Sequence, residues 1–281
     1  MSANRVLVLG GTGKTGRRVA ARMAARGLAV RIGSRTAVPR FDWEQPATWP
    51  EALHGVDAAY VAYHPDLAAP GAADAIQSLT GLAAASGVRR LVLLSGRGEP
   101  EARRCEQIVR DSGLEWTVVR ASWFAQNFSE GYLLDAVLAG EMTLPVGAVG
   151  EPFVDVNDIA DVAAAALTEA GHAGQLYEVT GPRLWTFAEA VAEISRATGR
   201  SIRYAQVSPE AYATALRDAQ LPEPMVALIT YLFAEVLDGR NASVADGVTR
   251  ALGRRPRDFT EYARDAAASG VWNPASWART A

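Results

Sequence analysis

Residues 5–16 read Arg5-Val-Leu-Val-Leu-Gly-Gly-Thr-Gly-Lys-Thr-Gly16. The apolar run at the start predicts a buried strand, and the spacing Gly-x-x-Gly-x-x-Gly that follows predicts a tight turn opening a helix. Glycines in such a turn let a pyrophosphate approach the main chain, where the helix N-terminus offers free N–H donors. The stretch therefore predicts a dinucleotide-binding loop, and the alternative is a plain glycine turn.

The triplet Gly13-Lys-Thr15 also occurs in the phosphate loop of nucleotide triphosphatases. That loop requires another glycine five residues before Gly13, and Val8 stands at that position. We therefore exclude a nucleotide triphosphatase of this kind.

Apolar runs recur through the first half of the chain and alternate with segments of helical spacing. The predicted strands cover residues 5–9, 29–33, 58–62, 90–95 and 116–120, and the helices between them cover about 15–26, 50–53, 72–86 and 103–112. Strands that alternate with helices in this way indicate a parallel sheet built from βαβ units. The predicted fold class is α/β, a Rossmann-type doubly wound parallel sheet.

The second half is richer in helical patterns. Its predicted elements are a helix over 158–170 capped by Asn157 or Asp158, a strand over 175–180, and helices over 186–198, 208–238 and 260–268. We predict an NADP-binding core over residues 1–157 and a C-terminal part over 158–281. That second part completes the sheet and forms a small, mainly helical substrate lobe, in which 208–238, split by Leu221-Pro-Glu-Pro224, is a candidate lid.

Composition and charge narrow the class of protein. The chain has 281 residues, 28 Lys and Arg against 31 Asp and Glu, and a net charge of −3. Without a basic tail or patch in the sequence, we expect no nucleic-acid partner. The single cysteine, Cys105, excludes an intramolecular disulfide framework, and we expect a packed, inert thiol. The three histidines lack metal-ligand spacing, so we expect no metal.

The start of the chain lacks the apolar core of a secretory signal, and charged residues or glycines interrupt every apolar run before it reaches membrane-spanning length. We therefore expect a cytoplasmic protein without a membrane partner, acting as a monomer or a dimer.

The end of the second predicted strand distinguishes NAD from NADP. NAD sites place an Asp or Glu about 20 residues after the glycine loop to hold the ribose hydroxyls. Here the strand ends in Ile32-Gly-Ser-Arg-Thr36, which supplies Ser34 and Arg35 instead of a carboxylate. A planar guanidinium suits a phosphate, and Lys14, the only lysine of the chain, adds a charge at the helix start. We predict NADP(H) as the cofactor; the alternative is that Arg35 is a solvated surface arginine.

The sequence resembles the NmrA-like group of atypical short-chain dehydrogenases/reductases along nearly its whole length. The stretches that carry the resemblance are Val6–Gly16, Ser34-Arg35, Ala52–Ala58, Ser112–Arg120, Trp123–Phe128, Phe153–Ala160, Tyr177–Pro182 and Leu252–Phe259. The group includes quinone reductases, reductases of iminium and carbonyl groups in secondary metabolism, and redox sensors that bind the cofactor without turnover.

The resemblance also implies site residues. Those expected to bind the cofactor are Gly10, Thr12, Gly13, Lys14, Thr15, Ser34, Arg35, Ala62, Tyr63, Ser95, Arg97 and Phe124, with Asp42 and Trp43 near the adenine, His64 near the ribose and Ser122 near the nicotinamide. Residues expected to contact the substrate are Trp123, Asn127, Tyr212 and Phe233. For the aromatic residues among them, the alternative is core packing.

The catalytic pair of the wider superfamily is absent. Its members use a tyrosine and a lysine four residues apart, whereas the only lysine here lies in the glycine loop and no tyrosine lies between Ser95 and Tyr132. Arg103 and Arg104, which stand in that region, are poor proton donors and are expected on a solvated helix face. The cofactor still carries the hydride. We expect Ser95 to assist by hydrogen bonding and the substrate itself to supply the proton.

These observations predict an NADP(H)-dependent ketoreductase that acts on a carbonyl of a bulky aromatic metabolite. The chain is similar to ketoreductases of aromatic polyketide antibiotic pathways, including those that act on angucyclinone-type polycycles. The alternatives are a quinone reductase, an iminium reductase and a non-catalytic NADP-binding redox sensor.

Overall fold

The computed structural model describes residues 5–274 and divides the chain into two compact units. The first unit contains residues 5–121, 156–179 and 246–255, and the second contains 122–155, 180–245 and 256–274. This division differs from the predicted boundary at residue 157. Segments from the C-terminal part return to the first unit because its sheet takes its last strand, and one covering helix, from them.

The first unit is built on a six-stranded sheet in which every neighbouring pair is parallel. The strands lie in the order β2 (Ala29–Gly33), β1 (Arg5–Leu9), β3 (Ala58–Val61), β4 (Arg90–Gly96), β5 (Glu115–Ala121) and β7 (Gln175–Val179). The strand order reverses between β1 and β3. Loops that follow these strands therefore meet beyond the carboxyl ends of the strands, at the position where open α/β sheets bind ligands. The predicted Rossmann-type fold is confirmed.

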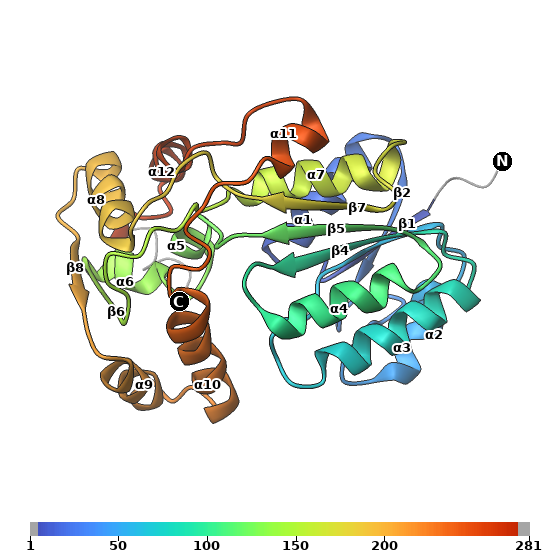
Figure 1. The fold of residues 1–281 in the computed structure, drawn as a ribbon, viewed down its shortest axis with the longest axis horizontal. Coiled ribbons are helices and arrows are strands. Elements are labelled where there is room, and N and C mark those ends of the chain that lie inside the picture. Colours follow the sequence, from blue (N-terminus) through green and yellow to red (C-terminus); the bar gives the residue numbers. More distant parts are fainter. Residues whose placement is uncertain (1–4, 275–281) are drawn as a thin grey trace. The chain divides into compact units, whose positions relative to one another are not determined.

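Helices cover both faces of this sheet (Figure 1). One face carries α1 (Lys14–Ala25) and α7 (Val156–Thr168), with α11 (Gly247–Leu252) beside α7 and β7, and the other carries α2 (Trp49–Leu53), α3 (Ala72–Ala85) and α4 (Pro100–Arg110), with the short helix η1 (Pro46–Thr48) before α2. Leucines of β1 and β4 pack with α2, α3 and α4 in a buried core. The strands are therefore shielded from water on both sides, as a parallel sheet requires.

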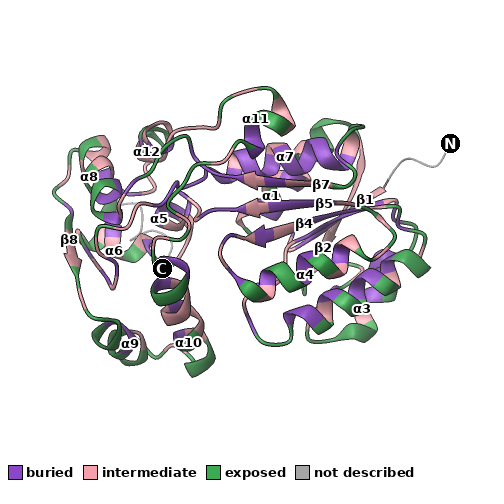
Figure 2. Ribbon diagram, viewed as in Figure 1, coloured by how far each residue is buried: buried purple, intermediate pink, exposed green. Residues whose placement is uncertain are grey.

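The helix α7 is buried along most of its length (Figure 2). Its alanines allow close approach to α1 and to the strands β3, β4 and β5. It begins at Val156, so the prediction of a cap at Asn157 or Asp158 is wrong. Asp158 lies in the first turn, fully buried, and pairs with Arg254 at 2.7 Å. This pair ties residues 246–255 to the first unit.

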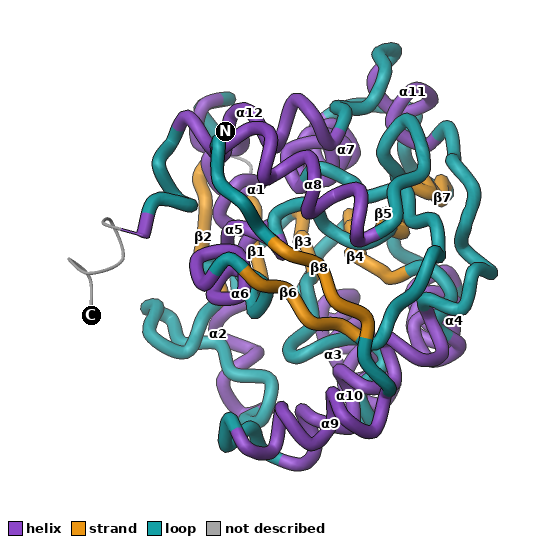
Figure 3. The backbone as a smooth tube through the Cα atoms, turned by 90° about the vertical axis from the view of Figure 1, so that its left-hand side faces the viewer, coloured by secondary structure: helices purple, strands orange, loops and turns teal. Residues whose placement is uncertain are grey.

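The second unit is mainly helical. Its helices are α5 (Asn127–Glu130), α6 (Leu134–Ala139), α8 (Phe187–Thr198), α9 (Pro209–Asp218), α10 (Glu223–Tyr231), the π-helical turn η2 (Leu232–Val236) and α12 (Phe259–Ala268). A parallel pair of strands, β6 (Glu141–Leu144) and β8 (Arg203–Gln206), lies side by side in Figure 3. The sequence analysis did not predict these two strands, because four residues are too few to establish a period.

The predicted helices over 186–198 and 208–238 of the second unit are confirmed. Thr186 and Glu189 form a reciprocal capping box before α8, and Gly199 ends the helix in the left-handed conformation with φ of +67°. The predicted segment 208–238 is helical on both sides of a proline-containing break, as α9 and then α10 with η2. Within residues 5–274, no helix has both the length and the apolar character needed to cross a membrane.

Candidate functional site

The glycine loop connects β1 to α1 at the carboxyl edge of the sheet, the edge formed by the C-terminal ends of its strands. Gly10 has a φ of +68°, which favours glycine, and its N–H donates to the carbonyl of Gly33 at 3.1 Å. A Cβ on Gly16 would lie 2.2 Å from the carbonyl oxygen of Gly10, so only glycine fits there. Helix α1 has no acidic residue in its first turn. The N-terminus of α1 is therefore open to an anion.

Side chains of the loop differ in exposure. Thr12 and Gly13 are exposed and Lys14 is half-buried, whereas Thr15 lies buried beneath them. The exposed positions are the ones from which a bound pyrophosphate is reached most directly. The proposed role of Thr15 rests on its N–H group in the first helical turn rather than on its hydroxyl.

The loop after β2 presents Arg35 to solvent. Within residues 5–274, its guanidinium makes no hydrogen bond or ion pair, while the neighbouring Asp42 is occupied by Arg40 at 2.7 Å. The N–H of Phe41 donates to the carbonyl of Ser34 at 2.9 Å and closes this loop. Arg35 is thus an exposed cation at the end of β2, where a carboxylate would favour NAD.

The loop after β3 lies against the glycine loop. A Cβ on Gly10 would be 3.2 Å from both the Cβ and the carbonyl oxygen of Ala62. The Tyr63 ring packs edge-on to Trp43 with centroids 4.8 Å apart, and Trp49 donates from Nε1 to the carbonyl of Asp42 at 2.7 Å. The structure therefore brings the predicted residues of the first three strand ends to one edge.

At the ends of β4, β5 and β7, charged side chains and one hydroxyl form a connected set that also includes a glutamate of α4. We call it the charged network, and its members are Ser95, Arg97, Glu106, Arg120 and Glu178. The Ser95 hydroxyl donates to Glu106 Oε1 at 2.7 Å, and Arg120 grips both oxygens of the same carboxylate, one of them through Nε at 2.8 Å. The hydrogen bond to Glu106 is the main cause that raises the pKa of Arg120 above its usual value. Glu106 is only 2% exposed.

Arg97 completes the charged network. Its Nε donates to Glu178 Oε1 at 2.5 Å, and Arg120 lies 3.6 Å from the other oxygen of that carboxylate. Because the Ser95 proton is committed to Glu106, assistance to a substrate by this hydroxyl would require it to change partner. Sequence reasoning selected Ser95 and Arg97 but missed the three residues that hold them. These three residues could be found only from the packing of α4, β4, β5 and β7, and the sequence alone does not reveal that packing.

Sequence reasoning also missed a pair of carboxyl groups beside this network. Asp66 follows β3 and Glu99 precedes α4, and the two carboxyl groups lie within hydrogen-bonding reach of each other. Burial raises the pKa of Glu99 to about 9, and the charge of Asp66 adds to this effect. Burial raises the pKa of Asp66 as well. We call these two residues the carboxyl pair.

The predicted substrate residues lie in the second unit. Phe233 is buried, with its ring centroid 4.9 Å from Trp123 and 5.4 Å from Tyr212. Phe187 and Tyr132 also contact Phe233, and we call these five side chains the aromatic cluster. Burial raises the pKa of Tyr212 to about 12. Three of the four predicted residues are thus brought together.

Asn127 and Phe124 lie on the neighbouring turn of the second unit. The N–H of Asn127 donates to the carbonyl of Phe124 at 3.0 Å, and Phe124 bridges to Val154 in a parallel arrangement. The Ser122 hydroxyl donates to the carbonyl of Pro152 at 2.6 Å. Both Phe124 and Asn127 are half-buried.

Several other predictions are settled by burial. Arg103 and Arg104 are exposed on α4, as predicted for a solvated helix face. Cys105 is buried, and that burial raises the pKa of its thiol to about 12, which confirms a packed thiol. His64 is exposed in its loop. Within the described residues, no group of three or more metal-ligating side chains is close enough to hold a metal ion.

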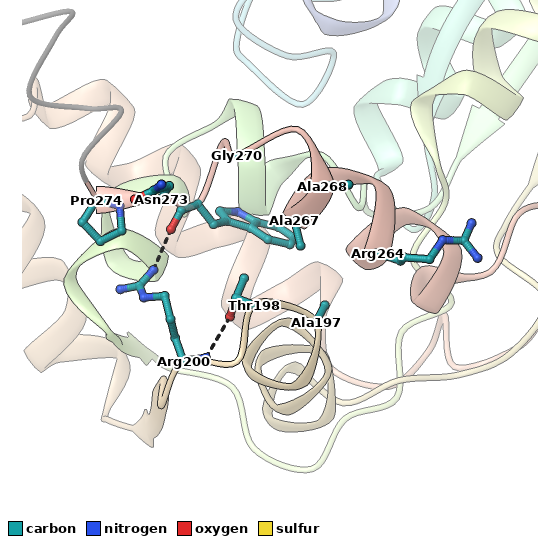
Figure 4. Close-up of a pocket in the computed structure, with 10 residues that line it drawn as sticks. Ala197, Thr198, Arg200, Arg264, Ala267, Ala268, Gly270, Asn273 and Pro274 are labelled. Atoms are coloured by element: carbon teal, nitrogen blue, oxygen red, sulfur yellow. Dashed lines mark hydrogen bonds between the residues drawn. The ribbon is translucent and has the colours of Figure 1, made fainter.

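A hollow of about 560 Å³ in the second unit lies at the C-terminal ends of α8 and α12 (Figure 4). Arg200 crosses it and donates to the carbonyl groups of Trp272 at 2.8 Å and Leu138 at 2.7 Å. The arginine therefore ties chain segments together, and no predicted site residue lines the hollow. We assign it no function.

Comparison with known proteins agrees with this class of fold. A profile of the NmrA-like family matches residues 103–263. A (4-alkanoyl-5-oxo-2,5-dihydrofuran-3-yl)methyl phosphate reductase of Streptomyces griseus is 35% identical, over 92% of this chain and 97% of the relative. An NAD(P)H azoreductase of Xenophilus azovorans is 33% identical, over 94% of this chain and 98% of the relative. The chain belongs to the NmrA-like family.

The fold is shared with solved structures. The NADPH-dependent quinone oxidoreductase QOR2 of Escherichia coli, solved in complex with NADPH, superposes with a TM-score of 0.73 and 22% identity, covering 92% of this chain and 99% of that one. The likeness supports the α/β architecture described above.

Proposed function

We propose that the protein is an NADP(H)-dependent reductase. The observation that carries the proposal is the carboxyl edge of the first unit, where the open helix N-terminus after Gly10–Gly13 and the exposed cation Arg35 lie on adjacent strand ends. A pyrophosphate suits the first feature, and a 2′-phosphate suits the second. The two relatives named above as reductases, at 33% and 35% identity, support the same class.

The cofactor supplies a hydride, and the protein binds and orients both reactants. In the proposed reaction the hydride goes to a carbonyl carbon, NADPH becomes NADP⁺, and the carbonyl oxygen takes a proton to give an alcohol. Neither the tyrosine nor the lysine of the usual pair is present to deliver that proton. We propose that a hydroxyl of the substrate, next to the ketone, donates to the developing oxyanion.

The substrate class proposed is a polycyclic aromatic ketone of the angucyclinone type. The aromatic cluster of the second unit offers flat apolar side chains of the kind that hold such a ligand, with Trp123 partly buried and Tyr132 exposed. In this proposal Trp123, Asn127, Tyr212 and Phe233 contact the substrate. The Streptomyces relative, a reductase of an oxo-dihydrofuran, supports a carbonyl-bearing or conjugated substrate.

A quinone or azo reductase is the second candidate. The azoreductase relative favours it, and such electron-poor substrates also need no tyrosine–lysine pair. Incubation of the protein and NADPH with a panel of polycyclic ketones, quinones, azo dyes and cyclic imines distinguishes the candidates. The proposal expects fastest NADPH oxidation with the ketones. Fastest oxidation with a quinone or azo dye would replace it, and no turnover with any compound would indicate a redox sensor.

The role of Ser95 has its own test within this proposal. General-acid help from a side chain supplies about 10²–10⁴-fold in rate, so Ser95→Ala should lower turnover by less than about 10²-fold. A matched variant, Ser112→Ala, removes a hydroxyl that donates to the carbonyl of Val109 and should leave turnover unchanged. Loss of all turnover in Ser95→Ala, with NADPH still bound, would contradict the proposed source of the proton.

A further inference from the structure

The carboxyl pair joins two loops that carry proposed cofactor residues. Glu99 is the residue before α4, and its carboxyl group does not cap that helix. Instead it folds back over Gly96, where a Cβ would meet the Glu99 carboxyl atoms at 2.3–2.7 Å. Glycine at position 96 therefore makes the space that the Glu99 carboxyl fills.

Glu99 is deeply buried and lacks an ordinary donor. It is 6% exposed, and no N–H or O–H within the described chain donates to its Oε2. Asp66 lies within hydrogen-bonding reach and accepts a hydrogen bond from the N–H of Ala68 at 2.8 Å through Oδ1. A buried acceptor without a donor is costly. One proton between the two carboxyl groups removes that cost, because one carboxyl group then donates to the other.

The charges around the pair favour retention of this proton. Within residues 5–274 neither carboxyl group forms an ion pair, and the charge of Glu106 on α4 also raises the pKa of Glu99. The cations of the neighbourhood are engaged elsewhere: Arg120 holds Glu106, and Arg97 holds Glu178. On the loop after β3, the half-buried Tyr63 has a pKa raised by burial, so it is neutral in the same range. Only the helix N-terminus favours the ionised form of Glu99.

We propose that Asp66 and Glu99 are positioning residues for the cofactor, which share one proton and thereby hold the loop after β3 against the loop after β4. Ala62 and Tyr63 lie on or beside the first loop, and Ser95 and Arg97 lie beside the second. The inference rests on the proposed function, because it assigns these loops to NADP(H) binding. Neither carboxyl group is proposed as the proton donor of the reaction.

Loss of the shared proton reverses the effect of the pair. Two carboxylates at hydrogen-bonding distance in a buried site repel each other strongly, since little water screens them. The two loops then separate, and the cofactor must bring them together again when it binds. The affinity for NADPH therefore falls as the pH rises through the pKa of Glu99, about 9.

The test is the dissociation constant of NADPH, measured by fluorescence with the full chain between pH 6 and 10 at constant ionic strength. The wild-type constant should rise about tenfold between pH 7 and pH 10, as expected when one proton with a pKa near 9 is required for binding. Glu99→Gln keeps a donor to Asp66 without the second charge, so its constant should change less than about twofold over the same range. Asp66→Asn should be equally flat.

Two controls separate this role from others. Glu101→Gln removes a half-buried carboxylate of the same helix, one that pairs with Arg104, and should keep the wild-type profile. Groups that titrate outside the carboxyl pair affect all variants alike, so their effect cancels in the comparison. A Glu99→Gln profile as steep as the wild type would overturn the positioning role alone. Absence of NADPH binding at pH 7 would overturn the proposed function and this role with it. A fall in the turnover of Glu99→Gln at saturating NADPH, with the pH profile of its NADPH affinity the same as in the wild type, would instead make Glu99 the proton donor and overturn the inference.

An infrared measurement tests the shared proton without the cofactor. At pH 7 the folded wild type should show the carbonyl band of a protonated carboxylic acid, and Glu99→Gln should lack it. A wild-type spectrum without that band would overturn the inference even if the variant bound NADPH normally.

Discussion

The two units hold their candidate functional residues by opposite means. At the carboxyl edge of the first unit, the charged network holds its side chains through directional hydrogen bonds. The carboxylate of Glu106, for example, accepts hydrogen bonds from both Ser95 and Arg120. In the second unit, Phe233 is held by rings on several sides and by no polar contact of its side chain. Ionic contacts specify atomic positions, whereas apolar contacts tolerate repacking at constant volume. The first unit is therefore suited to a ligand of fixed shape, and the second to one of variable shape.

The largest effect is expected from breaking the charged network. Glu106→Ala leaves Arg120 without its main partner in a mostly buried position, which typically costs about 3–5 kcal/mol of stability. Chemical denaturation measures the loss, and Glu106→Gln, which retains acceptor capacity, should lose less. The neighbouring exposed Gln107→Ala is the control. A change in Glu106→Ala no larger than in the control would show that the network is not what holds this edge.

The corresponding change in the aromatic cluster should cost about as much but act differently. Phe233→Ala removes a buried ring and should lower the free energy of unfolding by about 3 kcal/mol, while Phe233→Leu should lose less than about 1.5 kcal/mol. Both variants should keep wild-type affinity for NADPH. If Phe233→Leu proved as damaging as Phe233→Ala, the contrast between directional and adaptable packing would fail.

A smaller effect is expected at the end of β2. Arg35→Ala removes a charged donor to the 2′-phosphate, worth about 1.5–3 kcal/mol, so NADPH affinity should fall about 10–100-fold. Affinity for NADH should not change. Arg89→Ala, at the amino end of the strands, is the matched control and should alter neither. Equal affinities of the wild type for NADPH and NADH would contradict the NADP(H) assignment.

A last effect appears only as the pH rises and concerns the stability of the first unit. The folded-state pKa of Glu99, about 9, lies above the ordinary value of 4.5, so the folded chain keeps a proton that the unfolded chain has released. Stability from this group is complete below pH 4.5 and is lost as the pH rises toward 9, by at most about 1.4 kcal/mol per pH unit. Denaturation of wild type and Glu99→Gln at several pH values measures the difference. Between pH 5 and pH 8 the wild type should lose more stability than Glu99→Gln. Equal losses in the two proteins would argue against a raised pKa of Glu99.

The same contrast explains how far the sequence could be interpreted. The glycine loop and the strand end at Arg35 were predictable because their geometry depends on residues within one turn. The fold class followed from alternating strands and helices, each long enough to show its period.

Other features depend on which strands become neighbours. Glu106, Arg120 and Glu178 come together because α4 packs against β4 and β5, and β7 lies beside β5. Asp66 meets Glu99 because β3 lies beside β4. None of these pairings leaves a mark at fixed spacing in the sequence. The interleaving of the two units depends on strand pairing in the same way, since β7 joins a sheet whose other strands precede it.

Single-turnover kinetics test whether the substrate supplies the proton when NADPH reduces it. The measurement compares NADPH oxidation by a polycyclic ketone carrying a hydroxyl beside the carbonyl with oxidation by its methyl ether, on wild type and on Ser95→Ala. Methylation should slow hydride transfer by about 10²-fold or more, and Ser95→Ala should slow it less. Equal rates for the hydroxyl and methoxy compounds, with either protein, would contradict it.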